Sequence, residues 1–230
     1  MEAAPSQSTV EVAGTALVKG VVSAVPGVGA PIAEIIGLVT AVGFQRRMDD
    51  WYQSVVEAIE DVQDRVEDLE GLQSDPEFLD MLVATTRAAQ ATSREEKLVL
   101  FRNAVVNSVL PGAPDEDLKQ RFVRIVDEMI PFHMRLLVFL DDPRGWYAAH
   151  PEIPVQSLLM GSRMAILEPV FSELGQGQLE RLLADLSRWG LVSGGYQAMM
   201  TESGVWASST TQLGKHFLAF VASPATAGEC

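Results

Sequence analysis

Apolar residues dominate the first long stretch of the chain, residues 10–44, in which only Glu11, Lys19 and Glu34 are charged. Two prolines and two glycines interrupt this stretch at residues 26–31, and both residue types break helices. Each arm beside the break is shorter than the ~20 apolar residues of a membrane-spanning helix. The pattern therefore predicts an apolar helical hairpin, which is either buried by the rest of the chain or able to enter a bilayer.

The second arm of the hairpin continues without a breaker into a longer helix that we expect to end near Leu69. Apolar residues recur in it at three- and four-residue steps, which is typical of one helical face: Trp51, Val55, Ile59, Val62, Val66 and Leu69. The opposite face is acidic, and residues 1–70 contain four basic and twelve acidic side chains. We therefore predict a long acidic amphipathic helix that stops before Gly71.

Capping residues and apolar spacing predict a series of shorter helices after it. Ser74 to Glu77 resemble a cap, a first-turn proline and a first-turn acid, which open a helix through about Gln90. A capping box within residues 92–96 precedes a second helix. The expected helices then cover residues 97–110, 115–129 and 132–140.

The pattern is less regular beyond residue 140. The run Asp142-Pro143-Arg144-Gly145 predicts a turn into an irregular segment that reaches about residue 154. The spacing of apolar residues, which changes from a helical to a shorter period near residue 190, then predicts two helices, two short strands of a hairpin and a final helix. These elements are expected at residues 155–174 and 178–189 (helices), 190–192 and 205–210 (strands), and 213–221 (helix).

This order of elements predicts a mainly α protein. Its expected parts are a flexible N-terminus (1–9), a helical domain around the apolar hairpin (10–110), a winged-helix-like domain with a short β-hairpin (115–222) and a flexible tail (223–230). The Pro-Gly-Ala-Pro run at 111–114 is the preferred boundary. The ending is similar to a winged helix-turn-helix in Trp189-Gly190-Leu191-Val192 and in Thr211-Gln212-Leu213-Gly214-Lys215-His216-Phe217-Leu218.

Charge limits the classes of partner. Seventeen basic and 31 acidic residues give a net charge of −14, which disfavours the phosphate neutralisation that nucleic-acid binding requires. The same balance disfavours steady residence on anionic lipid. Cys230 is the single cysteine, so no internal disulfide forms, and the start of the chain lacks the basic region of a secretory signal. We expect the protein in the cytoplasm, either free or peripheral at the inner face of the membrane.

No residue pattern indicates catalysis. The three histidines do not cluster, and the metalloprotease, phosphate-loop and nucleophile-elbow motifs are absent from the sequence. We therefore expect no catalytic residue, metal, cofactor or small-molecule substrate. A protein partner or self-association is the expected interaction, with membrane contact on triggering as an alternative.

Two sets of residues are candidates for function. The first is the hairpin, which is expected to contact a partner or a membrane: Val21, Val25, Pro26, Gly27, Gly29, Pro31, Ile35, Ile36 and Val39. The second lies where a winged helix would contact DNA or a protein: Gln178, Arg181, Arg188 and Lys215. The polar face of helix 178–189 is mixed rather than basic, which favours a protein contact over DNA.

The order of parts resembles that of bacterial abortive-infection alpha (Abi-alpha) proteins and related bacterial helical proteins. The resemblance rests on short motifs spread over most of the chain: Pro26-Gly27-Val28-Gly29, Arg46-Arg47, Phe78, Glu96-Lys97, Phe101-Arg102-Asn103-Ala104, Asn107, residues 122–137 and the Leu-Gly-x-x-Phe-Leu ending. It implies a bacterial source and a role in phage defence. The expected function is that of a non-enzymatic defence or protein-interaction protein, with membrane activity through the hairpin as a possible mode of action. The alternative is a winged-helix DNA-binding transcriptional regulator.

Overall fold

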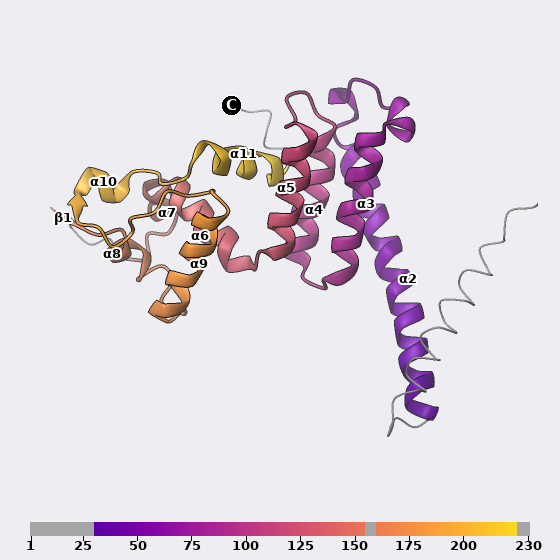
Figure 1. The fold of residues 1–230 in the computed structure, drawn as a ribbon, viewed down its shortest axis with the longest axis horizontal. Coiled ribbons are helices and arrows are strands. Elements are labelled where there is room, and N and C mark those ends of the chain that lie inside the picture. Colours follow the sequence, from indigo (N-terminus) through magenta and orange to yellow (C-terminus); the bar gives the residue numbers. More distant parts are fainter. Residues whose placement is uncertain (1–29, 155–159, 225–230) are drawn as a thin grey trace, which may run out of the picture. The chain divides into compact units, whose positions relative to one another are not determined.

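The computed structural model describes residues 30–154 and 160–224, and it divides the chain into two compact units, residues 1–56 and 57–230. In the described residues, ten α-helices and one two-stranded antiparallel sheet are present, which confirms the prediction of a mainly α protein. Figure 1 labels the helices and strand β1 along the chain. The predicted domain boundary at residues 111–114 stays a prediction.

The first described element is helix α2 (Ala30–Glu60). Val21, Val25, Pro26, Gly27 and Gly29 of the predicted hairpin lie outside the described residues. The other hairpin candidates lie on α2, where only the backbone is described: Pro31, Ile35, Ile36 and Val39. The helical path of the second arm is therefore observed, whereas the hairpin itself stays a prediction.

Helix α2 ends at Glu60, so the prediction of one acidic helix through Leu69 is wrong. The chain turns and forms two short 3₁₀ helices, η1 (Gln63–Arg65) and η2 (Gly71–Ser74). Acidic residues such as Asp61 repel the negative C-terminal end of a helix dipole. Val62 is buried with Val106 and Leu110, and this apolar contact holds the turned path.

Helices α3 (Pro76–Ala91), α4 (Glu95–Ser108) and α5 (Glu116–Glu128) pack on one another, as Figure 1 shows. The predicted starts of α3 and α5 are confirmed, because the carboxylate of Asp75 accepts from the Glu77 N–H and that of Asp115 from the Leu118 N–H, each at 2.9 Å. The three helices contribute fully buried side chains to the core: Met81, Ala89, Phe101, Ala104, Val105 and Phe122.

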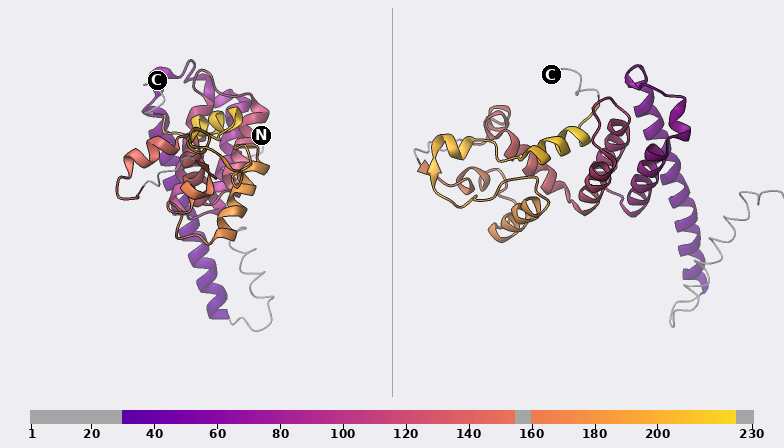
Figure 2. Two further views of the ribbon diagram at one scale, coloured as in Figure 1. Left: turned by 90° about the vertical axis from the view of Figure 1, so that its left-hand side faces the viewer. Right: turned by 45° about the horizontal axis from the view of Figure 1, so that its top comes forward.

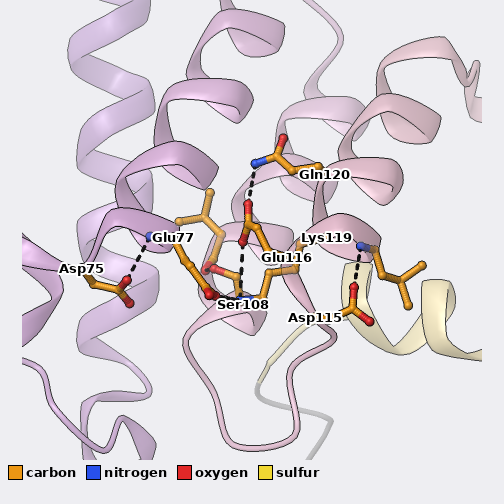
Figure 3. A network of polar contacts seen from close by, with 9 residues as sticks. Asp75, Glu77, Ser108, Asp115, Glu116, Lys119 and Gln120 are labelled. Carbon is orange, nitrogen blue, oxygen red and sulfur yellow. Dashed lines mark hydrogen bonds and ion pairs between the residues drawn. The ribbon is translucent and has the colours of Figure 1, made fainter.

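A network of polar side chains joins the starts of α3 and α5 (Figure 3). Lys119 Nζ lies 3.2 Å from Glu77 Oε2 and 3.8 Å from Glu116 Oε2, while Gln120 Nε2 donates to Glu116 Oε1 at 2.8 Å. The Lys119 side chain is 9% exposed, so these carboxylates offset the loss of its hydration. The network links two helices that are about forty residues apart in sequence.

The expected capping box before α4 does not form. The hydroxyl of Thr92 accepts from the Arg94 N–H at 3.2 Å, and Arg94 occupies the N-cap position without a side-chain bond to the helix. The loop after α3 thus turns through its own hydroxyl–backbone bond, which competes with capping.

Helix α6 (Pro131–Asp141) confirms the predicted start at Pro131. Helix α7 (Pro143–Ala149) replaces the predicted irregular segment. Asp142 caps it by accepting from the Gly145 N–H at 2.9 Å, and Pro143 occupies the first turn, where its missing N–H has no cost. Helix α6 packs against α7 and against α9 (Gln176–Arg188), as Figures 1 and 2 show.

The prediction of helix over residues 155–174 is largely wrong in the described part. Strand β1 (Met160–Gly161) pairs antiparallel with β2 (Met200–Thr201), and a single short helix, α8 (Met164–Leu167), follows. Pairing between strands 40 residues apart overrides the local helical preference, which is weak over so short a run.

The predicted hairpin of residues 190–192 and 205–210 is right in part. Val192 and Thr210 form an antiparallel bridge. Val205 and Trp206 instead belong to helix α10 (Glu202–Trp206), whose N-cap Thr201 accepts from the Gly204 N–H. Both side chains are buried, and the Trp206 ring lies 5.4 Å from that of Tyr147, so tertiary packing decides this segment. The final helix α11 (Gln212–Val221) is as predicted.

Candidate functional site

The cationic candidate surface lies on two helices. Gln178, Arg181 and Arg188 are exposed on α9, and Lys215 is exposed on α11. Arg188 is held by acids, with Nη2 at 3.0 Å from Asp185 Oδ1 and 3.9 Å from Glu128 Oε2. This surface therefore carries paired charges of both signs.

His133 lies beneath this surface at the start of α6 and is 4% exposed. Its Nδ1 accepts from the Ile130 N–H at 3.0 Å, so the neutral ring carries its proton on Nε2, which lies 3.5 Å from Asp185 Oδ2. The ring also packs edge-on against Trp189, with centroids 4.9 Å apart. Burial lowers the pKa of His133 below its usual 6.5, although the Asp185 carboxylate opposes the shift.

This pKa predicts how stability depends on pH. The unfolded chain binds the His133 proton at a higher pH than the folded chain, so the stabilisation is complete above about pH 6.5 and is lost as pH falls through the folded pKa. We expect His133→Asn, which can still accept from the Ile130 N–H, to flatten the loss of stability below that pH. Urea unfolding of both proteins at stepwise lower pH measures this, and parallel curves would contradict it.

The described unit 57–230 contains a large apolar pocket of about 810 Å³. Its walls are the first two turns of α4, the junction of α5 with α6, α6 itself, α7 and the residues that follow it, and Val170 with Phe171. Three apolar side chains of this lining are unusually exposed: Val99 (37%), Ile130 (38%) and Val138 (47%). A volume in this range is typical of small-molecule sites.

Few polar side chains reach the pocket. Lys97 is almost buried, its Nζ donates to the Asp127 carbonyl oxygen, and burial lowers its pKa, although the Asp127 carboxylate opposes the shift. Arg135 donates from Nη1 to Glu173 Oε1 at 2.9 Å. Glu96 is the acidic member of the lining. Lys97 is therefore held within the protein, whereas the Arg135–Glu173 pair is exposed, with side chains 52% and 43% accessible.

One wall of the pocket is aromatic. The rings of Trp146 and His150 on and after α7 stack with centroids 3.8 Å apart and planes at 10°. His150 Nδ1 lies 2.8 Å from the Trp146 carbonyl oxygen, which can only accept, so Nδ1 carries the proton. The hydrogen bond thus fixes the stack, and both rings line the pocket.

No pattern in the sequence predicted this pocket. One signal was present, because residues 132–140 read as apolar on nearly every side, and a helix of that kind is either fully enclosed or has a partner for its outer face. Val138 lies on that outer face. The other walls come from helices whose association only the fold determines.

No helix of the described residues is long and apolar enough to cross a membrane. In the same residues no three His, Cys, Asp or Glu side chains gather where they could hold a metal ion. Comparisons with protein-family models, curated proteins and solved structures found no match.

Proposed function

We propose that this chain is a non-enzymatic bacterial defence protein that acts by binding an apolar molecule or group in the pocket between α4, α6 and α7. The observation that carries the proposal is the exposed apolar lining of that pocket, with Val138 at its most exposed point. Exposed contiguous apolar surface on a soluble fold usually marks a binding site. The defence setting rests on the family resemblance alone.

The rigid frame of the pocket supports binding. Lys97 is held by Asp127, and the Trp146–His150 stack by its own hydrogen bond. A site whose walls are already ordered loses little conformational entropy when a ligand arrives. The pocket is thus suited to capture rather than to chemistry.

We also propose that α9, the Val192–Thr210 bridge and α11 form a winged-helix-like unit used for protein contact. The support is the order helix, bridge, helix and the hydroxyl of Thr211, which donates to the Gly190 carbonyl oxygen at 2.7 Å. Use as a DNA-binding regulator has weaker support. Arg188 is neutralised by acids, and Glu180 is exposed on the same helix.

The pocket is tested with a neutral solvatochromic dye whose fluorescence rises on leaving water. Val138→Asp places a charge against the bound dye, and we expect dye affinity to fall about tenfold, the effect of losing ~1.4 kcal/mol of apolar contact. Val83→Asp is the matched control, because Val83 lies on α3 outside the pocket and is equally exposed, at 47%. Dye titration with both variants gives the comparison. Equal affinity of the two variants, or no dye binding by the native protein, would reject the proposal.

A further inference from the structure

The pocket differs in charge from the rest of the chain. The whole protein has 31 acidic and 17 basic residues, yet the charged lining of the pocket is Lys97 and Arg135 against Glu96. Lys97 is paired with Asp127, whereas the Arg135 side chain is 52% exposed and bonds one carboxylate, so Arg135 is the cation of the lining that an anionic group can reach.

Arg135 has donors to offer a ligand. Glu173 receives one hydrogen bond from the guanidinium, at Nη1, out of the five N–H groups that an arginine carries. The guanidinium lies 5.0 Å from the Phe132 ring centroid and 5.6 Å from that of Phe171, which limits its motion. Its planar fork therefore remains oriented and able to bind a carboxylate with two parallel hydrogen bonds.

Apolar walls supply the rest of the contact. Val99, Val138 and Trp146 line the same pocket as Arg135. Its volume of about 810 Å³ is within the range of small-ligand sites. A single alkyl chain with a charged end matches both parts, the apolar walls and the cation.

We infer that the pocket binds a free, single-chain alkyl carboxylate, with the carboxylate on the Arg135 guanidinium and the alkyl chain along the walls of α4, α6 and α7. This inference rests on the proposed function, because it names the ligand class of the same pocket. Lys97 lies in the same lining, but its Nζ donates to the Asp127 carbonyl oxygen and lies 3.8 Å from the Asp127 carboxylate, so Arg135 is the cation assigned to the ligand. Glu173 competes with the ligand for the guanidinium.

Titration calorimetry of the full chain with decanoate and decan-1-ol separates the anionic group from the chain. We expect decanoate to bind about tenfold more tightly than the alcohol, the strength of one charge-assisted contact. Octanoate, with two fewer methylenes, should bind about 15-fold more weakly than decanoate, since each buried methylene contributes roughly fourfold. Equal affinity for acid and alcohol would overturn the inference, while binding of both would leave the proposed function standing.

Variants of the arginine locate the carboxylate. Arg135→Gln should bind decanoate and decan-1-ol equally. Arg144→Gln should behave as the native protein, because Arg144 also lies over an aromatic ring, that of Trp206, and pairs with a glutamate but lies outside the pocket. A decanoate preference that survives in Arg135→Gln would overturn the assignment.

Two further arms guard against loss of folding and against a membrane source. Glu173→Gln keeps an oxygen that can accept from Arg135 Nη1 but removes the competing negative charge, so decanoate should bind a few-fold more tightly; weaker or unchanged binding would count against the inference. Vesicles of phosphatidylglycerol test a lipid headgroup as the ligand. One outcome would assign the pocket to a membrane surface and overturn the free carboxylate as its ligand. In that outcome the native protein sediments with the vesicles, Arg135→Gln abolishes the sedimentation, and decanoate does not bind. Failure of decanoate, decan-1-ol and the neutral dye together would reject both proposals.

Discussion

Asn107→Ala should lower the free energy of unfolding by roughly 3 kcal/mol. Asn107 is buried on α4, and its Nδ2 donates to the Phe220 carbonyl oxygen at 2.8 Å and the Ala222 carbonyl oxygen at 2.9 Å, at the end of α11. The last carbonyls of a helix have no partner within the helix. Truncation would leave these buried acceptors unsatisfied, at about 1–3 kcal/mol each.

Urea unfolding measures this change, with Asn103→Ala as a graded control. Asn103 donates one bond, from Nδ2 to the Val221 carbonyl oxygen at 3.0 Å, so its loss should be about half as large. Asn107→Asp should be at least as damaging as Asn107→Ala, because it places negative charge against the negative end of α11. A loss below about 1 kcal/mol in Asn107→Ala would show that water replaces the amide.

Gly214→Ala should destabilise the protein by roughly 2–3 kcal/mol, as overpacking against the backbone does. A Cβ at Gly214 would lie 2.1 Å from the Leu191 carbonyl oxygen and 2.6 Å from Thr210 Cγ2, so the chain would have to move. Helix propensity alone predicts the opposite sign, a gain of about 1 kcal/mol for Gly→Ala within a helix. The sign of the change therefore separates close packing from propensity.

Gly177→Ala is the matched control for this measurement. Gly177 lies in the first turn of α9, as Gly214 does in that of α11, but no atom lies within 4 Å of the position its Cβ would take. We expect a small gain in stability from it in the same thermal or urea unfolding experiment. If Gly214→Ala stabilised the protein as much as Gly177→Ala, the close contact with Leu191 would be refuted.

Asn107 and Gly214 both belong to motifs that carry the family resemblance, and the sequence did not reveal their role. The Phe-Arg-Asn-Ala-x-x-Asn run contains Asn103 and Asn107, which cap α11 from α4. The Leu-Gly-x-x-Phe-Leu run contains Gly214, where the chain crosses Leu191. The four-residue spacing of Asn103 and Asn107 on one helix face was visible in the sequence, but their partners at the end of α11 lie more than a hundred residues away. The residue that Gly214 approaches, Leu191, lies in a loop. No local pattern could reveal these contacts.

Local chemistry allowed several helix starts to be predicted. Asp75, Asp115 and Thr211 act within three residues of themselves, as each side chain accepts from a nearby backbone N–H. The same rule would have predicted α7, because Asp142-Pro143 repeats the arrangement of Asp75-Pro76. The exposed positions Arg181 and Lys215 were also predictable, since charged residues outside an apolar stripe face solvent.

The sequence by itself determined the helical class, the caps of α3 and α5, and the apolar stripes of α5 and α11, because all three follow from residues close together in the chain. Tertiary structure alone decided where α2 ends, that Met160 pairs with Thr201, and that Val205 is helical. It also decided the pocket, whose walls come from residues 96 to 171. The physical reason is that burial is shared between distant segments, and each segment adopts the conformation that lets its neighbours pack.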